Sequence, residues 1–123
     1  MDITISFDRR SYKWCKQEHV NLVRLKTYEK QLNRQLESYK YVLLRDVFEV
    51  LGIPVTKESL TAGWVYDTMK TGFFEFKLHP KSNGVIEVIL SDMEKDIRYA
   101  FPSGKSFPGL YSFLKVYAII IFL

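Results

Sequence analysis

Residues 11–38 read SYKWCKQEHVNLVRLKTYEKQLNRQLES and decide the fold, because they contain neither glycine nor proline. Apolar residues recur along this stretch at spacings of three, four and seven: Cys15, Leu22, Leu25, Leu32, Leu36 and, just beyond it, Tyr39. At 100° per residue these side chains share one face of an α-helix. The spacing therefore predicts a long amphipathic helix of roughly 40 Å. We expect part of it to project from so small a domain or to pair with a second helix.

The opposite face of this predicted helix is basic. Lys16, Lys26, Lys30 and Arg34 fall within about 80° of one another. Like charges four residues apart cost a few tenths of a kcal/mol per pair unless an anion lies between them. We therefore expect this face to bind a polyanion and to contact the backbone of a nucleic acid rather than to read its bases. The alternative is a solvated face that Glu29 and Glu37 partly neutralise.

The positive charge of the chain is confined to its first third. Residues 1–45 hold ten Lys and Arg against five Asp and Glu, a net of +5, and the rest of the chain holds eight against nine, a net of −1, which gives the total of +4. With 47% hydrophobic and 26% charged residues, the composition excludes a disordered or low-complexity chain. A single cysteine, Cys15, excludes an internal disulfide. Residues from Met1 onward lack the pattern of a secretory signal, so we expect a cytoplasmic protein.

A second, shorter helix is predicted over Tyr41–Leu51, where Leu44, Val47, Phe48 and Leu51 share a face and Gly52 and Pro54 stop it. The short connection after Ser38 favours an antiparallel pair with the first helix. Asp8 is positioned to cap the long helix, and Thr56 to cap one further turn at Thr56–Leu60.

Alternating or β-branched and aromatic runs predict strands. These runs are Ile3–Phe7, Trp64–Tyr66, Phe73–Leu78, Val85–Leu90 and Ile97–Phe101. The last four are expected to form an antiparallel meander, with a type I′ turn at Asn83-Gly84. The sequence thus predicts one α+β domain over 1–123, in which 1–63 is mainly helical and basic and 64–123 is mainly β.

The segment Leu110–Leu123 is almost entirely apolar, with Lys115 as its only charge. It is shorter than the roughly twenty residues that a membrane-spanning helix needs, so we expect no membrane partner. It is expected to form a helix or a strand, buried in the core or in a homo-oligomer interface made by Leu110, Leu114, Tyr117 and Ile121.

Asp67, Glu75 and Lys77 form the one pattern that resembles a catalytic site. In Mg²⁺-dependent nucleases two carboxylates hold the metal ion and a lysine helps to position water. However, Glu-x-Lys is also common on the polar side of strands in soluble sheets. Cys15 is expected to be a small buried hydrophobic residue. Trp14 and Trp64 are expected to be core or interface anchors. His19 and His79 have no residues near them in the sequence that would form a catalytic pair. No cofactor or metal is predicted, and an enzyme is less favoured than a binding protein.

Four segments resemble a family of small uncharacterised proteins encoded by phages and conjugative elements of Gram-positive bacteria. They are VNLVRLK (20–26), EKQLN (29–33), YVLLRDVFEVLGIP (41–54) and GWVYD (63–67), so the resemblance covers about residues 1–67. The apolar, acid-bearing strand motif with which such proteins often end is missing here. The resemblance implies an accessory protein of a mobile element, acting in a bacterial cytoplasm, and implies no catalytic residue.

These observations lead to three hypotheses of function. The first is a non-enzymatic protein that binds a nucleic acid or a host nucleoprotein through the basic helix, in its most concrete form an anti-CRISPR-like inhibitor of host defence. The second is a Mg²⁺-dependent nuclease that uses Asp67, Glu75 and Lys77. The third is an assembly protein that oligomerises through Leu110–Leu123.

Overall fold

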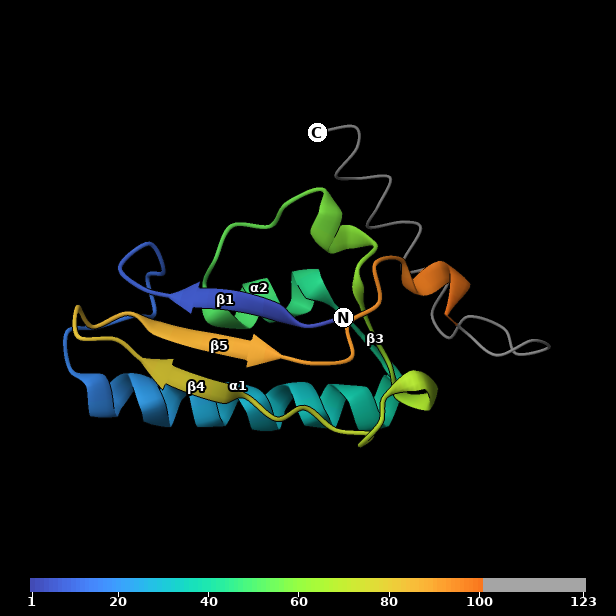
Figure 1. The fold of residues 1–123 in the computed structure, drawn as a ribbon, viewed down its shortest axis with the longest axis horizontal. Coiled ribbons are helices and arrows are strands. Elements are labelled where there is room, and N and C mark those ends of the chain that lie inside the picture. The colour runs from blue at the N-terminus through green and yellow to red at the C-terminus, as the bar shows by residue number, and fades with distance from the viewer. Residues whose placement is uncertain (101–123) are drawn as a thin grey trace.

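The computed structural model of the chain describes residues 1–100, and these form an α+β fold, as predicted (Figure 1). The helices and strands are β1 (Ile3–Phe7), α1 (Glu18–Tyr39), β2 (Tyr41–Leu43), α2 (Leu44–Leu51), β3 (Gly63–Val65), β4 (Lys77–Pro80) and β5 (Ile86–Leu90). Short 3₁₀ turns lie at Glu58–Leu60, Tyr66–Thr68 and Ile97–Tyr99.

The larger sheet is antiparallel and has β5 at its centre, with β1 on one side and β4 on the other. Val88 lies opposite Ile5 on β1 and opposite Leu78 on β4. Side chains alternate along β5, so that Ile86, Val88 and Leu90 are buried while the residues between them are half-buried. This alternation gives the sheet one face that packs on the helices and one that faces outward.

The core lies between the inner face of this sheet and the two helices. Leu25, Leu32 and Leu36 of α1 are buried in it together with Val47 and Leu51 of α2. Trp64 is also fully buried, and its ring meets Phe74 edge-on with centroids 5.0 Å apart. Its indole N–H donates to the carbonyl oxygen of Ser91 at 2.8 Å, so burial leaves this polar group satisfied.

The segment between the helices differs from the prediction. Tyr41–Leu43, predicted as the start of the second helix, instead form β2, which pairs antiparallel with β3. Lys40 ends α1 in a left-handed conformation with φ 68°. Its N–H donates to the carbonyl oxygen of Leu36 at 2.8 Å. After this reversal α2 runs back against the direction of α1, which agrees with the antiparallel pair expected (Figure 1).

The long helix begins at Glu18 rather than near Ser11, so the prediction was wrong over 11–17. The reason is tertiary: the Ser11 hydroxyl donates to the Leu51 carbonyl oxygen, and Lys13 Nζ donates to that of Val50 at 2.8 Å. These bonds hold the segment against the end of α2. Asp8 accepts from the backbone and side chain of Arg10 instead of capping α1, and Cys15 precedes the helix instead of lying on its apolar face.

In the described part of the chain, two sheets replace the predicted meander. Only Lys77 and Leu78 of the run Phe73–Leu78 lie in a strand, and Ile97–Tyr99 form a 3₁₀ turn where a strand was predicted. The turn between β4 and β5 is not type I′, because Gly84 has a positive φ of 85° and Asn83 does not. The turn closes instead through a hydrogen bond from Gly84 N–H to the Lys81 carbonyl oxygen at 3.2 Å.

Two further predictions concern the apolar C-terminal segment and the absence of a membrane partner. The apolar segment Leu110–Leu123, with its interface residues Leu110, Leu114, Tyr117 and Ile121, lies outside the described residues. Within residues 1–100, no helix has the length and hydrophobicity to cross a membrane.

Candidate nucleic-acid interface

The outward side of α1 carries the basic residues that the sequence singled out. Lys26, Lys30 and Arg34 lie on this side, and Leu25 and Leu32 on the other side of the helix are fully buried. We call these three basic residues the α1 basic row. Its members lie four residues apart, which is a rise of about 6 Å along the helix for each step. Glu37 is exposed on the same helix near the end of the row.

The three charges of the α1 basic row are not equally free. Lys26 Nζ lies 3.2 Å from Glu29 Oε1, and the other oxygen of that carboxylate accepts the backbone N–H of Phe76 at 2.8 Å. Lys30 and Arg34 form no ion pair with any residue of the described part of the chain. The neutralisation by Glu29 predicted as the alternative is therefore seen for Lys26, and within residues 1–100 Lys30 and Arg34 have no ion-pair partner.

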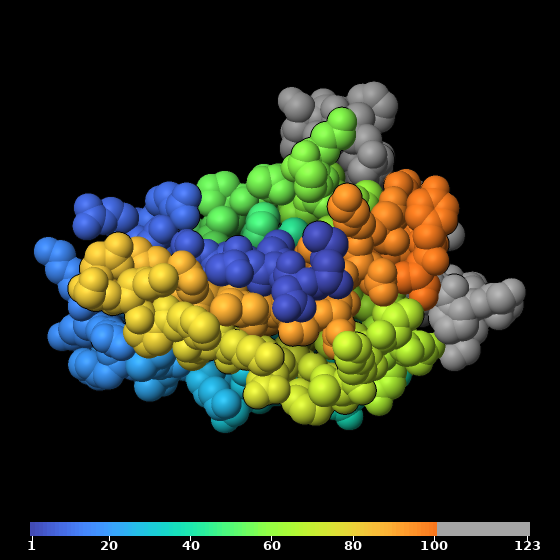
Figure 2. Space-filling view, in the orientation of Figure 1, coloured from blue at the N-terminus to red at the C-terminus, as the bar shows by residue number. Residues whose placement is uncertain are grey.

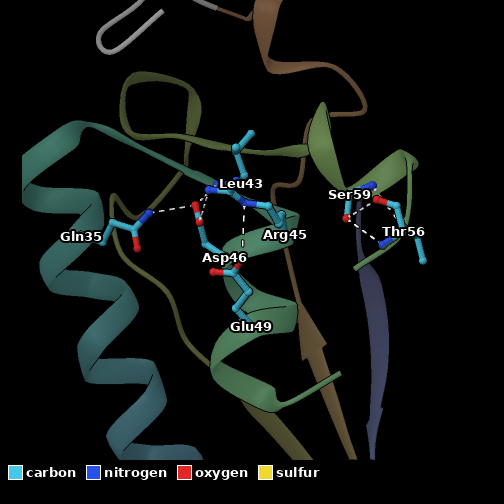
Figure 3. Close-up of polar contacts among 7 residues, drawn as sticks. All are labelled: Gln35, Leu43, Arg45, Asp46, Glu49, Thr56 and Ser59. Atoms are coloured by element: carbon cyan, nitrogen blue, oxygen red, sulfur yellow. Dashed lines mark hydrogen bonds and ion pairs between the residues drawn. The ribbon is translucent and has the colours of Figure 1, made fainter. Parts of the chain in front are cut away.

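Polar contacts on the flanks of α1 fix its orientation. Gln35 Nε2 donates to Asp46 Oδ2 at 2.9 Å, and the same oxygen accepts the N–H of Leu43 just before α2 (Figure 3). Near the middle of the helix, Asn33 makes two hydrogen bonds with the backbone of Phe74. Because these contacts tie the flanks to α2 and to residues 74–76, the basic row is the side that points to solvent.

Lys16 does not belong to the α1 basic row, because it precedes the helix. It is exposed and lines a separate hollow with Arg9, Trp14 and Lys81. Arg10, next to Arg9, lies 3.0 Å from Asp8, and its hydrogen bonds hold the pKa of that carboxyl below the usual 3.8. Nothing in the sequence pattern pairs Lys81 with these N-terminal residues, since the two segments lie far apart along the chain.

The residues of the nuclease alternative are only partly brought together. Glu75 and Lys77 line one cleft of about 350 Å³, which also includes Asp2, Lys70 and Asp92. Asp67 lies in the turn Tyr66–Thr68 and is not among the residues that line this cleft. In the part of the chain that the structure covers, no group of three or more His, Cys, Asp or Glu side chains could hold a metal ion. The nuclease assignment stays a prediction.

The cysteine, the two histidines and the two tryptophans lie at separate places in the fold. Cys15 is half-buried, and its backbone N–H and carbonyl oxygen are both bonded to the side chain of Asn21, at 3.0 and 2.7 Å. His19 and His79 are exposed on different elements. Trp64 is a core residue, as predicted, and Trp14 is half-buried against the edge of the core.

Comparison with known proteins gives one match. A model described as a family of unknown function, DUF6353, matches residues 3–102, which is most of the chain. No curated protein and no solved structure matches. The match extends well past Asp67, where the resemblance identified from the sequence ends, and it assigns no activity.

Proposed function

We propose that this chain, which belongs to the DUF6353 family of unknown function, binds the sugar-phosphate backbone of a nucleic acid through the α1 basic row. The observation that carries the proposal is the pair Lys30 and Arg34. They lie about one turn apart on the outward side of α1, and neither is paired with a carboxylate of residues 1–100. Two neighbouring like charges repel each other, and a phosphate placed between them removes this repulsion.

The chemistry of the row favours contact with backbone over recognition of bases. Lysine offers a compact charge on a flexible stem, which neutralises phosphates without fixing a base edge. The row also lies along a helix whose flanks are tied to the rest of the fold. We therefore expect binding that depends weakly on sequence and strongly on salt.

The resemblance to proteins of phages and conjugative elements extends this proposal. In a bacterial cytoplasm, the same row would contact the nucleic acid of a host nucleoprotein, and a guide-loaded nuclease is the most concrete target. The protein would then act as an inhibitor of host defence without catalysing a reaction. Cleavage assays of such a nuclease, with and without the protein, test this extension, and unchanged cleavage would exclude it.

The test of the main proposal is a charge reversal with a matched control. Lys30→Glu with Arg34→Glu removes both unpaired cations of the row, while Lys57→Glu with Lys95→Glu makes the same change of net charge at two exposed lysines elsewhere. Binding to labelled duplex DNA and RNA is measured by fluorescence anisotropy at several salt concentrations. If two phosphate contacts are lost, the negative slope of log K against log salt for duplex DNA becomes shallower by about 1.8.

The comparison of the two double variants decides the outcome. The proposal is supported if the Lys30/Arg34 variant binds more weakly and its affinity depends less steeply on salt, while the Lys57/Lys95 variant changes little. Equal losses in both variants would mean that only net charge matters, and the row would have no special role. An absence of binding to any nucleic acid by the unmodified protein would overturn the proposal.

A further inference from the structure

A hollow lies at the corner where the loop before α1 meets the turn between β4 and β5. Its volume is about 750 Å³, and it is lined by Arg9, Trp14, Lys16, Glu18 and the turn residues 81–84. A smaller hollow of about 380 Å³ adjoins it and shares Arg9, Trp14 and Asn83. In Figure 2 the gold turn and the blue N-terminal residues adjoin at the left end of the molecule. The corner thus joins two segments that are far apart in sequence.

The ring of Trp14 is fixed in this corner. Its indole N–H donates to the carbonyl oxygen of Gly84 at 3.0 Å. Gly84 has a φ of 85°, and a Cβ added there would lie 3.1 Å from Cζ2 of the indole, so the turn packs closely on the ring. The side chain is nevertheless only half-buried and borders both hollows. A fixed and partly open aromatic surface loses little conformational entropy when a planar group stacks on it.

Positive charge surrounds this ring. The two hollows are lined by four cations, Arg9, Arg10, Lys16 and Lys81, and by two carboxylates, Asp8 and Glu18. Arg10 is paired with Asp8 at 3.0 Å, and Lys81 with Glu87 at 3.3 Å. Arg9 and Lys16 form no ion pair within residues 1–100. These two residues are therefore the cations available to an anionic ligand.

We propose that this corner binds a single strand of nucleic acid, with one base stacked on Trp14 and the neighbouring phosphates beside Arg9 and Lys16. The inference rests on the proposed function and adds a preference for single strands to it. An aromatic platform beside a cationic groove is the arrangement that binds unpaired bases. The bases of a duplex are stacked on one another and cannot reach the ring.

The test uses the full chain and oligothymidylate of about ten nucleotides, a length within the range that one aromatic-lined groove covers. Trp14→Leu keeps an apolar side chain of moderate size but removes the stacking surface, and Arg9→Glu with Lys16→Glu removes the two unpaired cations. Lys57→Glu with Lys95→Glu is the charge control. Circular dichroism verifies that each variant is folded. Trp14→Leu is expected to weaken binding of the single strand between about fivefold and 100-fold, with little change for duplex.

Tryptophan emission gives a second readout, which starts from the unmodified protein. Trp64 is fully buried, so quenching of the unmodified protein by the oligonucleotide reports on Trp14. Quenching that Trp14→Leu abolishes, with a loss of affinity in the Arg9/Lys16 variant, supports the inference. Suppose that binding requires Lys30 and Arg34, that it does not change the tryptophan emission of the unmodified protein, and that Trp14→Leu binds as tightly as that protein. This result overturns the inference about Trp14 but not the proposed function. No binding to single strand or duplex overturns both proposals.

Discussion

Asn33 and Phe74 are joined by two hydrogen bonds although they lie far apart along the chain. The backbone N–H of Phe74 donates to Asn33 Oδ1 at 2.5 Å, and Asn33 Nδ2 donates to the Phe74 carbonyl oxygen at 3.1 Å. The amide of Asn33 thus occupies the position that a neighbouring strand would take. Residues 73–76 run beside α1 without belonging to a sheet because the helix supplies these partners.

Replacing Asn33 with leucine is therefore expected to destabilise the fold. The change leaves the N–H and carbonyl oxygen of Phe74 without their partners, and each unsatisfied buried group costs about 1–3 kcal/mol. Urea unfolding should show a loss of at least ~2 kcal/mol. Gln31→Leu, at an exposed position of the same helix, should change the free energy of unfolding by less than about 0.5 kcal/mol. Similar losses in both variants would contradict the role assigned to Asn33.

Asp46 is expected to be the main polar determinant of where α2 begins. Its carboxylate accepts from Leu43 N–H and from Gln35 Nε2, both at 2.9 Å, so it caps α2 and ties it to α1 (Figure 3). Asp46→Ala should lower the free energy of unfolding by about 1–2 kcal/mol. Asp46→Asn keeps one acceptor oxygen and should lose less. If thermal denaturation shows equal stability for Asp46→Asn and Asp46→Ala, the hydrogen bonds that Asp46 accepts do not account for the loss of stability.

Gly63 is expected to tolerate no side chain. A Cβ at this position would lie 2.3 Å from the carbonyl oxygen of Val42 and 2.9 Å from Cα of Leu43, both of which are backbone atoms of the paired strand β2. Gly63→Ala should therefore separate β2 from β3 and cost at least ~2 kcal/mol in chemical denaturation. Gly72→Ala is a comparison, because there the nearest atoms belong to the Tyr66 ring and the positive φ alone costs about 1 kcal/mol. Equal losses at the two glycines would contradict the close approach of β2 to β3.

The ion pair of Asp8 with Arg10 predicts a dependence of stability on pH. Hydrogen bonds from Arg10 lower the pKa of Asp8 in the folded protein below the 3.8 of an unperturbed group. A lowered pKa means that the carboxylate stabilises the fold above about pH 4 and that this contribution is lost as the pH falls through the folded value. The unmodified protein should exceed Asp8→Asn in stability at neutral pH, and the difference should vanish in strong acid. A constant difference across this range would contradict the assignment.

Helices and strands could be predicted from the sequence where the apolar pattern that defines them lies within one continuous segment. The central part of α1 and strand β5 were predicted because Leu25, Leu32 and Leu36, and the alternation of Ile86, Val88 and Leu90, are visible within one segment. The start of α1 was predicted wrongly, because Ser11 and Lys13 bind carbonyl groups at the end of α2. No local pattern records a contact between segments so distant in sequence.

The candidate sites show the same division. The α1 basic row could be predicted, since its three members repeat every four residues on one helix. Lys16 was wrongly placed on the predicted helix. It precedes α1, because the contacts of Ser11 and Lys13 with the end of α2 keep residues 11–17 out of the helix. The corner around Trp14 could not be predicted, because Lys81 and Gly84 approach it through the pairing of β4 with β5 and the packing of that turn on the indole.

The pairing of β1 with β5 has a consequence for how the chain folds during synthesis. Ile3 lies opposite Leu90, so the first strand has no partner in the larger sheet until Leu90 has left the ribosome. Until then its apolar side chains and unpaired backbone groups remain available to chaperones or to other nascent chains. Contacts of such long sequence separation also slow folding. The helices can form early, but the sheet against which they pack is completed late.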